Sequence, residues 1–460
     1  MNAPDHIAQA APTLTAKLAD YIVGTQYAAI PQAVFEPAKL AMLDTLAVAW
    51  AGSDAPGCRE ARALMVDEGT RTEATAWAYG DKLPAQAAAF INGMTSSALD
   101  YDSLALDAPV HLNIAVMPAA LAVAERVHAS GREFLAALVI GSDLMCRLAA
   151  ASLKPPQGFH YVSLYGVFGA AAAAAKLLKL DAAQTRHALG IAFMQTGGSQ
   201  QANIDPSLSK RMLSAFAARS GVFAAQLAAR GITGPAQALE GELGLYKLFQ
   251  KGDPARLLDA LGTRFDSTRI SLKQFPSCGC NHMTIHGWLK MLRQYDLKPD
   301  DVLSIELTLP PYTARLVGGA YDPSGDAQVA AQFSIKYSVA CCLVRRRLGL
   351  AEIEVEAARD PKILAHVPKV SVQVDPSRTG TRGPVDAVVQ TRTHGELRAV
   401  FDVLPGGEGA PMTKDDVADK FNECFGRGVR PLDAARIANL TRRVYEVEKL
   451  DDVARFFDGV

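Results

Sequence analysis

The stretch "SLYGVFGAAAAAAKLLKL", residues 163–180, decides how the first half of this chain folds. It is apolar around most of the circumference of a helix, which predicts a central helix covered on all sides. Glycine and alanine occupy residues 169–175, and side chains this small let neighbouring backbones approach closely. We therefore expect a core of tightly packed helices.

The sequence on both sides of this stretch keeps a helical pattern, from about residue 13 to 265. Residues 34–53 repeat apolar positions at spacings of three and four and stop at a Gly-Ser pair. Residues 114–152 predict two helices separated at Ser130–Gly131. Residues 214–231 are again rich in small side chains and end with Arg-Gly, a cationic last turn followed by a glycine cap.

The pattern changes near residue 267 from helical spacing to strand spacing. Residues 268–275, 301–310 and 369–375 alternate apolar and polar positions, the period of a half-buried strand. Residues 387–403 do the same around a turn near His394–Gly395, which predicts a hairpin.

These patterns predict a mainly α fold. Helix returns after the Gly- and Pro-rich stretch 404–411 and runs from Lys414 towards the C-terminus. We expect a large all-helical domain made from residues 1–266 and 406–460. A smaller α+β lid domain, residues 267–405, is inserted into it.

The composition excludes several classes of protein. Among 460 residues, 47 Lys and Arg nearly balance 48 Asp and Glu, so no basic surface for nucleic acid is expected. Charges interrupt every apolar run before the about 18 residues that a membrane span needs. The seven cysteines form no disulfide framework, and the N-terminus has no signal peptide pattern. We expect a cytoplasmic globular protein that binds neither nucleic acid nor membrane.

Cofactor motifs are also missing. Neither a dinucleotide-binding nor a P-loop glycine pattern is present. Cys278, Cys280, His282 and His286 have spacings that could hold zinc, but the glutamate of the zinc-hydrolase helix and a second cysteine pair are absent. We therefore predict no metal and no other cofactor.

Four polar segments interrupt the apolar sequence, each just before a helix that is apolar or rich in small residues. The first, "ALDYDSLALDAPVHLN" at 98–113, places three carboxylates and a histidine between two buried elements. The other three are "PPQGFHYVSLYG", "DPSLSKRMLSAFAARSG" and "SLKQFPSCGCNH". Taken singly, a histidine beside a helix is often only a core or capping residue, and a Lys-Arg pair at a helix start is often solvated. Taken together, the four segments indicate a cleft. The candidate residues are Asp100, His111, His160, Lys210, Arg211, Lys273 and His282.

These residue types suit proton transfer next to a carboxylate. Histidine titrates near neutral pH, and ammonium groups offset the negative charge that builds up when a proton leaves such a carbon. An enediolate-like intermediate can expel hydroxide, be protonated on its other face, or arise by loss of carbon dioxide. The residues thus predict a lyase or isomerase whose substrate is a small di- or tricarboxylate.

The same segments, in this order, resemble the MmgE/PrpD family, which includes 2-methylcitrate dehydratase, cis-aconitate decarboxylase and iminodisuccinate epimerase. The resemblance covers nearly the whole chain. It rests on six collinear blocks: "LDTLAVAWAGS", "INGMTSSALDYDS…VHLNIAVMPAALAVAE", "GFHYVSLYGVFGAAAAAAKLL", "SLSKRMLSAFAARSGVFAAQLAARGITGP", "LKQFPSCGCNH" and "AAQFSIKYSVAC". The family implies a helical domain with a smaller α+β lid domain, a homodimer, and no metal or organic cofactor.

The resemblance also implies roles for individual residues. His111 and His160 are proton-transfer candidates, and Asp100 orients a histidine or acts as a base. Lys210 and Lys273 are expected to anchor carboxylates. The remaining residues are Tyr337, as a donor to a leaving hydroxyl or a developing anion, and Cys278 and His282, as substrate-binding groups. The residue pattern itself adds Arg211 as a further substrate-binding cation.

The sequence departs from the family pattern in the loop that should face the substrate. Ser103 and Leu104 replace an acid and a threonine, and Leu112–Asn113 follow His111 in place of Pro-Ser. The first expectation is dehydration of a 2-methylcitrate-like hydroxy acid. Epimerisation or cis-aconitate-type decarboxylation in the same fold stays open, as does a non-catalytic polycarboxylate-binding protein.

Overall fold

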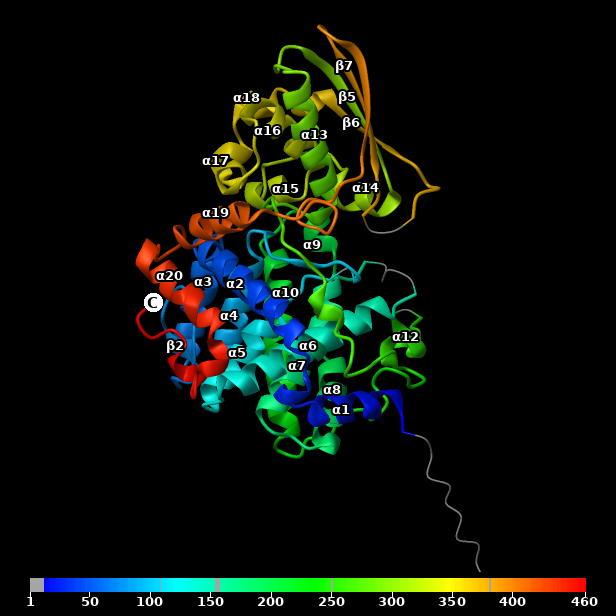
Figure 1. The fold of residues 1–460 in the computed structure, drawn as a ribbon. Coiled ribbons are helices and arrows are strands. Elements are labelled where there is room, and N and C mark those ends of the chain that lie inside the picture. The colour runs from blue at the N-terminus through cyan, green and yellow to red at the C-terminus, as the bar shows by residue number, and fades with distance from the viewer. Residues whose placement is uncertain (1–11, 109, 154–157, 250, 380–381) are drawn as a thin grey trace, which may run out of the picture.

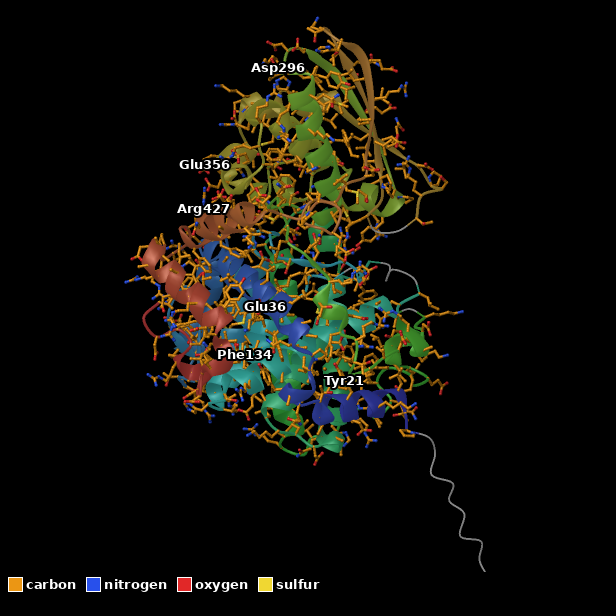
Figure 2. The ribbon with its side chains drawn as sticks, in the orientation of Figure 1. Tyr21, Glu36, Phe134, Asp296, Glu356 and Arg427 are labelled. Carbon is orange, nitrogen blue, oxygen red and sulfur yellow. The ribbon has the colours of Figure 1, made fainter. Side chains whose placement is uncertain are left out.

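The computed structural model describes residues 12–108, 110–153, 158–249, 251–379 and 382–460. Its buried hydrophobic side chains form two clusters (Figure 1). The larger cluster lies in the helical lower part of the view and the smaller cluster, Phe275 to Phe401, in the upper part that carries the sheet. Figure 2 shows Tyr21 and Phe134 in the lower part, Asp296 and Glu356 in the upper part, and Arg427 near the junction.

The lower part is built of helices around α7 (Tyr161–Leu177). Every residue of α7 except Lys176 is buried, which confirms the predicted central helix. Its neighbours include α5, α6, α8 and α10. The helices of this part are α1 (Leu14–Gly24), α2 (Phe35–Gly52), α3 (Cys58–Glu68), α4 (Ala85–Ser97), α5 (Val116–Arg126), α6 (Gly131–Ala150), α7, α8 (Ala182–Phe193), α9 (Gln201–Ile204), α10 (Ser209–Ala228), α11 (Leu245–Leu248), α12 (Pro254–Leu258), α19 (Lys414–Phe425) and α20 (Ala434–Tyr445). Although α7 is almost wholly apolar, no helix in the described ranges is both long and apolar enough to cross a membrane.

Small residues let α7 and α10 touch along their backbones. A Cβ atom added to Gly221 of α10 would lie 2.4 Å from the Cβ of Ala170 and 2.7 Å from the backbone nitrogen of Ala171. Helices α6 and α7 also approach closely, because a Cβ on Gly141 of α6 would lie 2.6 Å from the carbonyl oxygen of Gly169 in α7. The alanine-rich stretch therefore sets how closely the central helices pack.

Local signals place several helix ends where the sequence predicts them. Helix α2 ends at Gly52, and Ser130 caps the start of α6 by accepting a hydrogen bond from the backbone of Glu133. Helix α10 ends at Ala228, three residues before Gly231. Gly231 has a positive φ of 83° and donates to the carbonyl of Ala228, so the glycine closes a further turn after the helix.

The upper part contains one four-stranded sheet in the order β6-β5-β7-β8. Strands β5 and β6 are parallel, whereas β5–β7 and β7–β8 are antiparallel. The predicted hairpin is confirmed, and alternate residues of β7 are buried. The elements are α13 (His282–Gln294), β5 (Val302–Leu309), α14 (Pro311–Val317), α15 (Ala327–Gln332), α16 (Ile335–Arg345), α17 (Val355–Ala358), α18 (Pro361–Leu364), β6 (Val370–Val374), β7 (Val385–Thr391) and β8 (Gly395–Phe401).

The fold differs from the sequence prediction in its short strands. The predicted strand at 268–275 is reduced to β4 (Ile270–Ser271), which pairs with β3 (Leu104–Ala105) and not with the four-stranded sheet. A second two-residue pair, β1 (Ala74–Thr75) with β2 (Lys82–Leu83), also lies in the part expected to be all helical. The mainly α class holds, and the predicted boundaries 1–266, 267–405 and 406–460 remain a prediction.

We predict that Gly221→Ala lowers the free energy of unfolding by about 1–3 kcal/mol, because the added methyl group forces α7 and α10 apart. Urea denaturation followed by circular dichroism measures this. The matched control is Gly24→Ala in the last turn of α1, where nothing lies within 4 Å of the added atom. Equal stability of the two variants would contradict close helix contact as the reason for the glycine.

Candidate active site

The loop between α4 and α5 carries the first group of site residues. Asp100 has a positive φ of 49°, a left-handed conformation that aspartate tolerates better than most residues. Further along the loop, β3 pairs with β4, so the segment that follows β4 is held against the loop. This pairing brings Lys273 to Asp100.

Asp100 is bound by two ammonium groups in the protein interior. Lys210, in the first turn of α10, contacts Oδ1 of Asp100. Lys273 Nζ lies 2.8 Å from Oδ2 and also donates to the Asp100 carbonyl at 2.6 Å. Asp100, Lys210 and Lys273 are 2 %, 5 % and 0 % exposed, so water does not compete for these contacts. We call these three residues the aspartate–lysine triad.

The contacts within the triad favour the ionised forms of Asp100 and Lys273. Burial alone would raise the pKa of Asp100, but Lys210 and Lys273 outweigh it and hold that pKa well below its usual range. Burial alone would lower the pKa of Lys273, but Asp100 raises it above the ordinary value. Both oxygens of Asp100 are therefore engaged by cations.

A second buried ion pair supports the same loop. Lys420 of α19 lies 2.6 Å from Asp44 of α2 and donates to the carbonyls of Tyr101 and Lys273 at 2.9 and 3.0 Å. The other oxygen of Asp44 accepts from the backbone nitrogen of Ser103 at 2.9 Å. This network fixes the backbone on both sides of Asp102.

Asp102 orients His111. Its Oδ2 lies 2.7 Å from Nδ1 of His111. Burial would raise the pKa of Asp102, but His111 and Lys273 lower it below the ordinary value, so the carboxylate is ionised. An ionised carboxylate can only accept, so Nδ1 of His111 carries the hydrogen and Nε2 remains for another partner.

His160 lies beside His111 at the start of α7. The two ring centroids are 6.4 Å apart, and the backbone nitrogen of His160 donates to the carbonyl of Gly198 at 2.9 Å. Burial, with the nearby charges of Lys210 and His111, lowers the pKa of His160 to about 3. His160 is therefore uncharged at neutral pH, and its Nδ1 has no hydrogen-bond partner among the described residues.

These side chains face a pocket between the two parts of the molecule. The larger part contributes Asp100, His111 and His160, and the smaller part contributes Cys278, Cys280, Tyr312 and Arg382. The cavity volume is about 70 Å³. Clefts for drug-sized ligands have roughly 300–1,000 Å³, so this pocket is smaller than such clefts.

The structure brings most of the predicted site residues together. Asp100, His111, His160 and Cys278 line the pocket. Lys210 and Lys273 are held at Asp100 rather than lining the pocket themselves. Asp100 engages both lysines, and the expectation that Lys210 and Lys273 anchor substrate carboxylates stays a prediction.

Three further predicted residues, Arg211, Tyr337 and His282, do not line the pocket, and their hydrogen bonds go to other parts of the protein. Arg211 donates to the carbonyl of Pro56 at 2.6 Å and to Gln328 at 3.1 Å. The Tyr337 hydroxyl donates to the carbonyl of Glu352 at 2.5 Å.

His282 is the third. Burial, followed by the charge of Lys273, lowers its pKa to about 3, so the uncharged ring donates from Nε2 to the carbonyl of Ser277 at 3.1 Å. All three residues are at most 1 % exposed, and their expected roles at the site stay predictions.

The sequence reasoning missed Tyr312 and Arg382, which line the pocket from the smaller part. Tyr312 lies in the first turn of α14, and Arg382 lies just before β7. Neither belongs to a polar segment that precedes a small-residue helix, the pattern that marks the predicted residues. Only the folded arrangement brings them to His111.

The departures from the family pattern have unequal consequences. Leu104 lines the pocket, so an apolar side chain stands there in place of a hydroxyl. Ser103 binds Asp44 through its backbone, Leu112 is buried, and Asn113 accepts from the Ser142 hydroxyl at 3.0 Å. Of the four changes, only Leu104 alters the lining of the pocket.

One group could ligate a metal. Among the described residues, Asp100, Asp102 and His111 are the only set of three or more acidic, histidine or cysteine side chains whose ligand atoms lie within 4.8 Å of one another. The two lysines on Asp100 repel a cation at this place. The cysteine–histidine set considered as a zinc site, from Cys278 to His286, does not form such a group.

Comparison with known proteins agrees with this architecture. Residues 16–258 match the MmgE/PrpD N-terminal domain, and residues 275–445 match the MmgE/PrpD C-terminal domain. The chain belongs to the MmgE/PrpD family.

Relatives within the family share about a quarter of their residues with this chain. A cis-aconitate decarboxylase-like protein, oryM, of Aspergillus oryzae is 27% identical, covering 96% of both chains. The cis-aconitate decarboxylase of Aspergillus terreus is 26% identical, covering 92% of this chain and 91% of its own. That of Homo sapiens is 25% identical, covering 96% and 93%.

We predict that Asp100→Asn lowers the free energy of unfolding by about 3–5 kcal/mol, because it leaves two buried ammonium groups without a carboxylate. Urea denaturation measures the loss. The control is Asp107→Asn in the same loop, since Asp107 is exposed and paired with Arg269, and should cost about 0–1 kcal/mol. If both variants lose the same amount, the triad is not what holds the loop.

Proposed function

We propose that this protein is a lyase that decarboxylates a small polycarboxylate, with cis-aconitate as the first candidate substrate. The observation that carries the proposal is the Asp102–His111 pair beside an uncharged His160 in a small pocket. The named activity of relatives that cover nearly the full chain supports the same reaction.

Decarboxylation of cis-aconitate consumes one proton. The bond between a carboxylate carbon and its neighbour breaks, carbon dioxide leaves, and the electron pair moves into the unsaturated carbon skeleton. A proton then forms a new C–H bond, so the trianion becomes a five-carbon dianion. The site therefore needs one group that delivers a proton to carbon.

His111 is the proposed proton donor. Asp102 binds Nδ1 and leaves Nε2 for the substrate. The Asp102 carboxylate stabilises the positive charge that the His111 ring carries before it donates its proton. After the product leaves, water protonates the ring again. His160 is uncharged, so its N–H offers a hydrogen bond to the negative charge that develops on the substrate.

Dehydration of a 2-methylcitrate-like acid is the alternative, and it is less well supported. The expected acid for the leaving hydroxyl was Tyr337, whose own hydroxyl is buried and donates to Glu352. Epimerisation and non-catalytic polycarboxylate binding are the remaining outcomes that the assay must separate.

The test is incubation of the purified protein in deuterated water with cis-aconitate, and separately with 2-methylcitrate and other polycarboxylates, followed by NMR and carbon dioxide measurement. We expect one carbon dioxide and one carbon-bound deuteron per molecule of product. Water loss from 2-methylcitrate without carbon dioxide would indicate a dehydratase. Deuterium exchange without net conversion would indicate an epimerase. If no polycarboxylate is converted, the non-catalytic polycarboxylate-binding protein is the hypothesis that remains.

Asp102→Asn tests the proposed role of His111 within this reaction. An amide at this position no longer fixes the tautomer, so we expect kcat to fall by roughly 10²–10⁴-fold with KM nearly unchanged. Asp107→Asn serves as the control and should keep wild-type kcat. Wild-type turnover in Asp102→Asn would remove His111 from the proposed role.

We also propose, from the family, that turnover needs no metal or organic cofactor and that the chain works as a cytoplasmic homodimer. Activity that survives dialysis against a strong chelator would support the first point. Size-exclusion chromatography with light scattering would decide whether the chain is a homodimer.

A further inference from the structure

Arg382 enters the pocket from the smaller part of the molecule. It lies between β6 and β7, three residues before Val385, and lines the pocket together with Tyr312 and Cys280. Its Nη2 donates to the carbonyl of Ala105, on the loop that carries Asp100 and His111, at 3.3 Å. Arg382 therefore spans the two walls of the pocket.

The guanidinium of Arg382 has no acidic partner among the described residues. The ionisable groups that influence it are Cys280, Cys278 and Tyr312, and none is a carboxylate. Burial lowers the pKa of Arg382, and these three groups offset only part of that effect. A guanidinium has five donors, and the long contact to Ala105 uses one of them.

Another arginine of the same connection shows the contrast. Arg378 is paired with Asp375 at 3.0 Å and also contacts Asp386. It does not line the pocket. One arginine of this segment is thus neutralised within the protein, and the other presents its charge to the cavity.

The lysine and carboxylate charges at the pocket balance, and His111 adds one positive charge when it is protonated for the proposed reaction. Lys210 and Lys273 stand against Asp100 and Asp102, two positive charges against two negative ones, and His160 is uncharged. Behind them, Lys420 is paired with Asp44. The lysines therefore leave no net charge for a polyanionic ligand, whereas Arg382 supplies one.

We propose that Arg382 is the residue that recognises a carboxylate of the substrate, one that the reaction does not remove. This rests on the proposed function. The planar fork of a guanidinium matches a carboxylate with two parallel hydrogen bonds, which a lysine cannot reproduce. Tyr312 adds a donor, because its oxygen accepts from Gln200 at 3.3 Å and its own hydrogen stays available. The ligand class is a di- or tricarboxylate.

The test compares Arg382→Met and Arg382→Lys with the matched control Arg378→Met. Kinetics with cis-aconitate give kcat and KM, and calorimetry with tricarballylate, a saturated tricarboxylate, gives binding without turnover. We expect Arg382→Met to raise KM and the dissociation constant by roughly 10- to 100-fold with a smaller effect on kcat. Arg382→Lys should recover part of the loss, and Arg378→Met should match wild type.

The outcomes separate this inference from the proposed function. Tricarballylate binding that depends on Arg382, without turnover of cis-aconitate, would sustain the inference and remove the decarboxylase. Turnover with the same KM in wild type and Arg382→Met would overturn the inference and leave the decarboxylase. A failure of the wild-type protein to bind or convert any polycarboxylate would overturn both. Circular dichroism and thermal melting check that each variant is folded.

Discussion

The contact between Asp100 and its two lysines is the constraint on which the site depends. It joins the end of α4, the first turn of α10 and the segment after β4, three places far apart in the sequence. Removing the carboxylate leaves buried ammonium groups without a partner. The resulting loss of folding free energy is far larger than the contribution of an exposed ion pair. The loop that follows Asp100 is thereby held where Asp102 can orient His111.

Charge balance then divides the polar groups by task. The lysines neutralise carboxylates and fix backbone, Asp102 sets the tautomer of His111, and burial keeps His160 uncharged. Arg382 is left with a charge that no described acid balances. One carboxylate of a ligand would supply the missing negative charge, which is the role proposed for the substrate at Arg382.

The sequence predicts the parts of this arrangement that depend on local signals. Apolar spacing indicates α7 and the β7–β8 hairpin, and the polar segments before helices identify Asp100, His111 and His160. It does not show which partner a buried cation meets, and the partner of Lys210 and Lys273 in the fold is Asp100. The same limit applies to Arg211 and Tyr337, whose partners come from distant segments. Arg382 stands in a connection between strands that has no distinctive pattern.

The most direct measurement is a crystal structure of the protein with tricarballylate bound. The account predicts the ligand in the pocket between the two parts, with one carboxylate on the Arg382 guanidinium and its carbon skeleton beside Nε2 of His111. The contradicting result is a ligand that leaves Arg382 unoccupied. Binding instead in the separate cavity lined by Arg71, Arg126, Arg219 and Arg230 would be such a result.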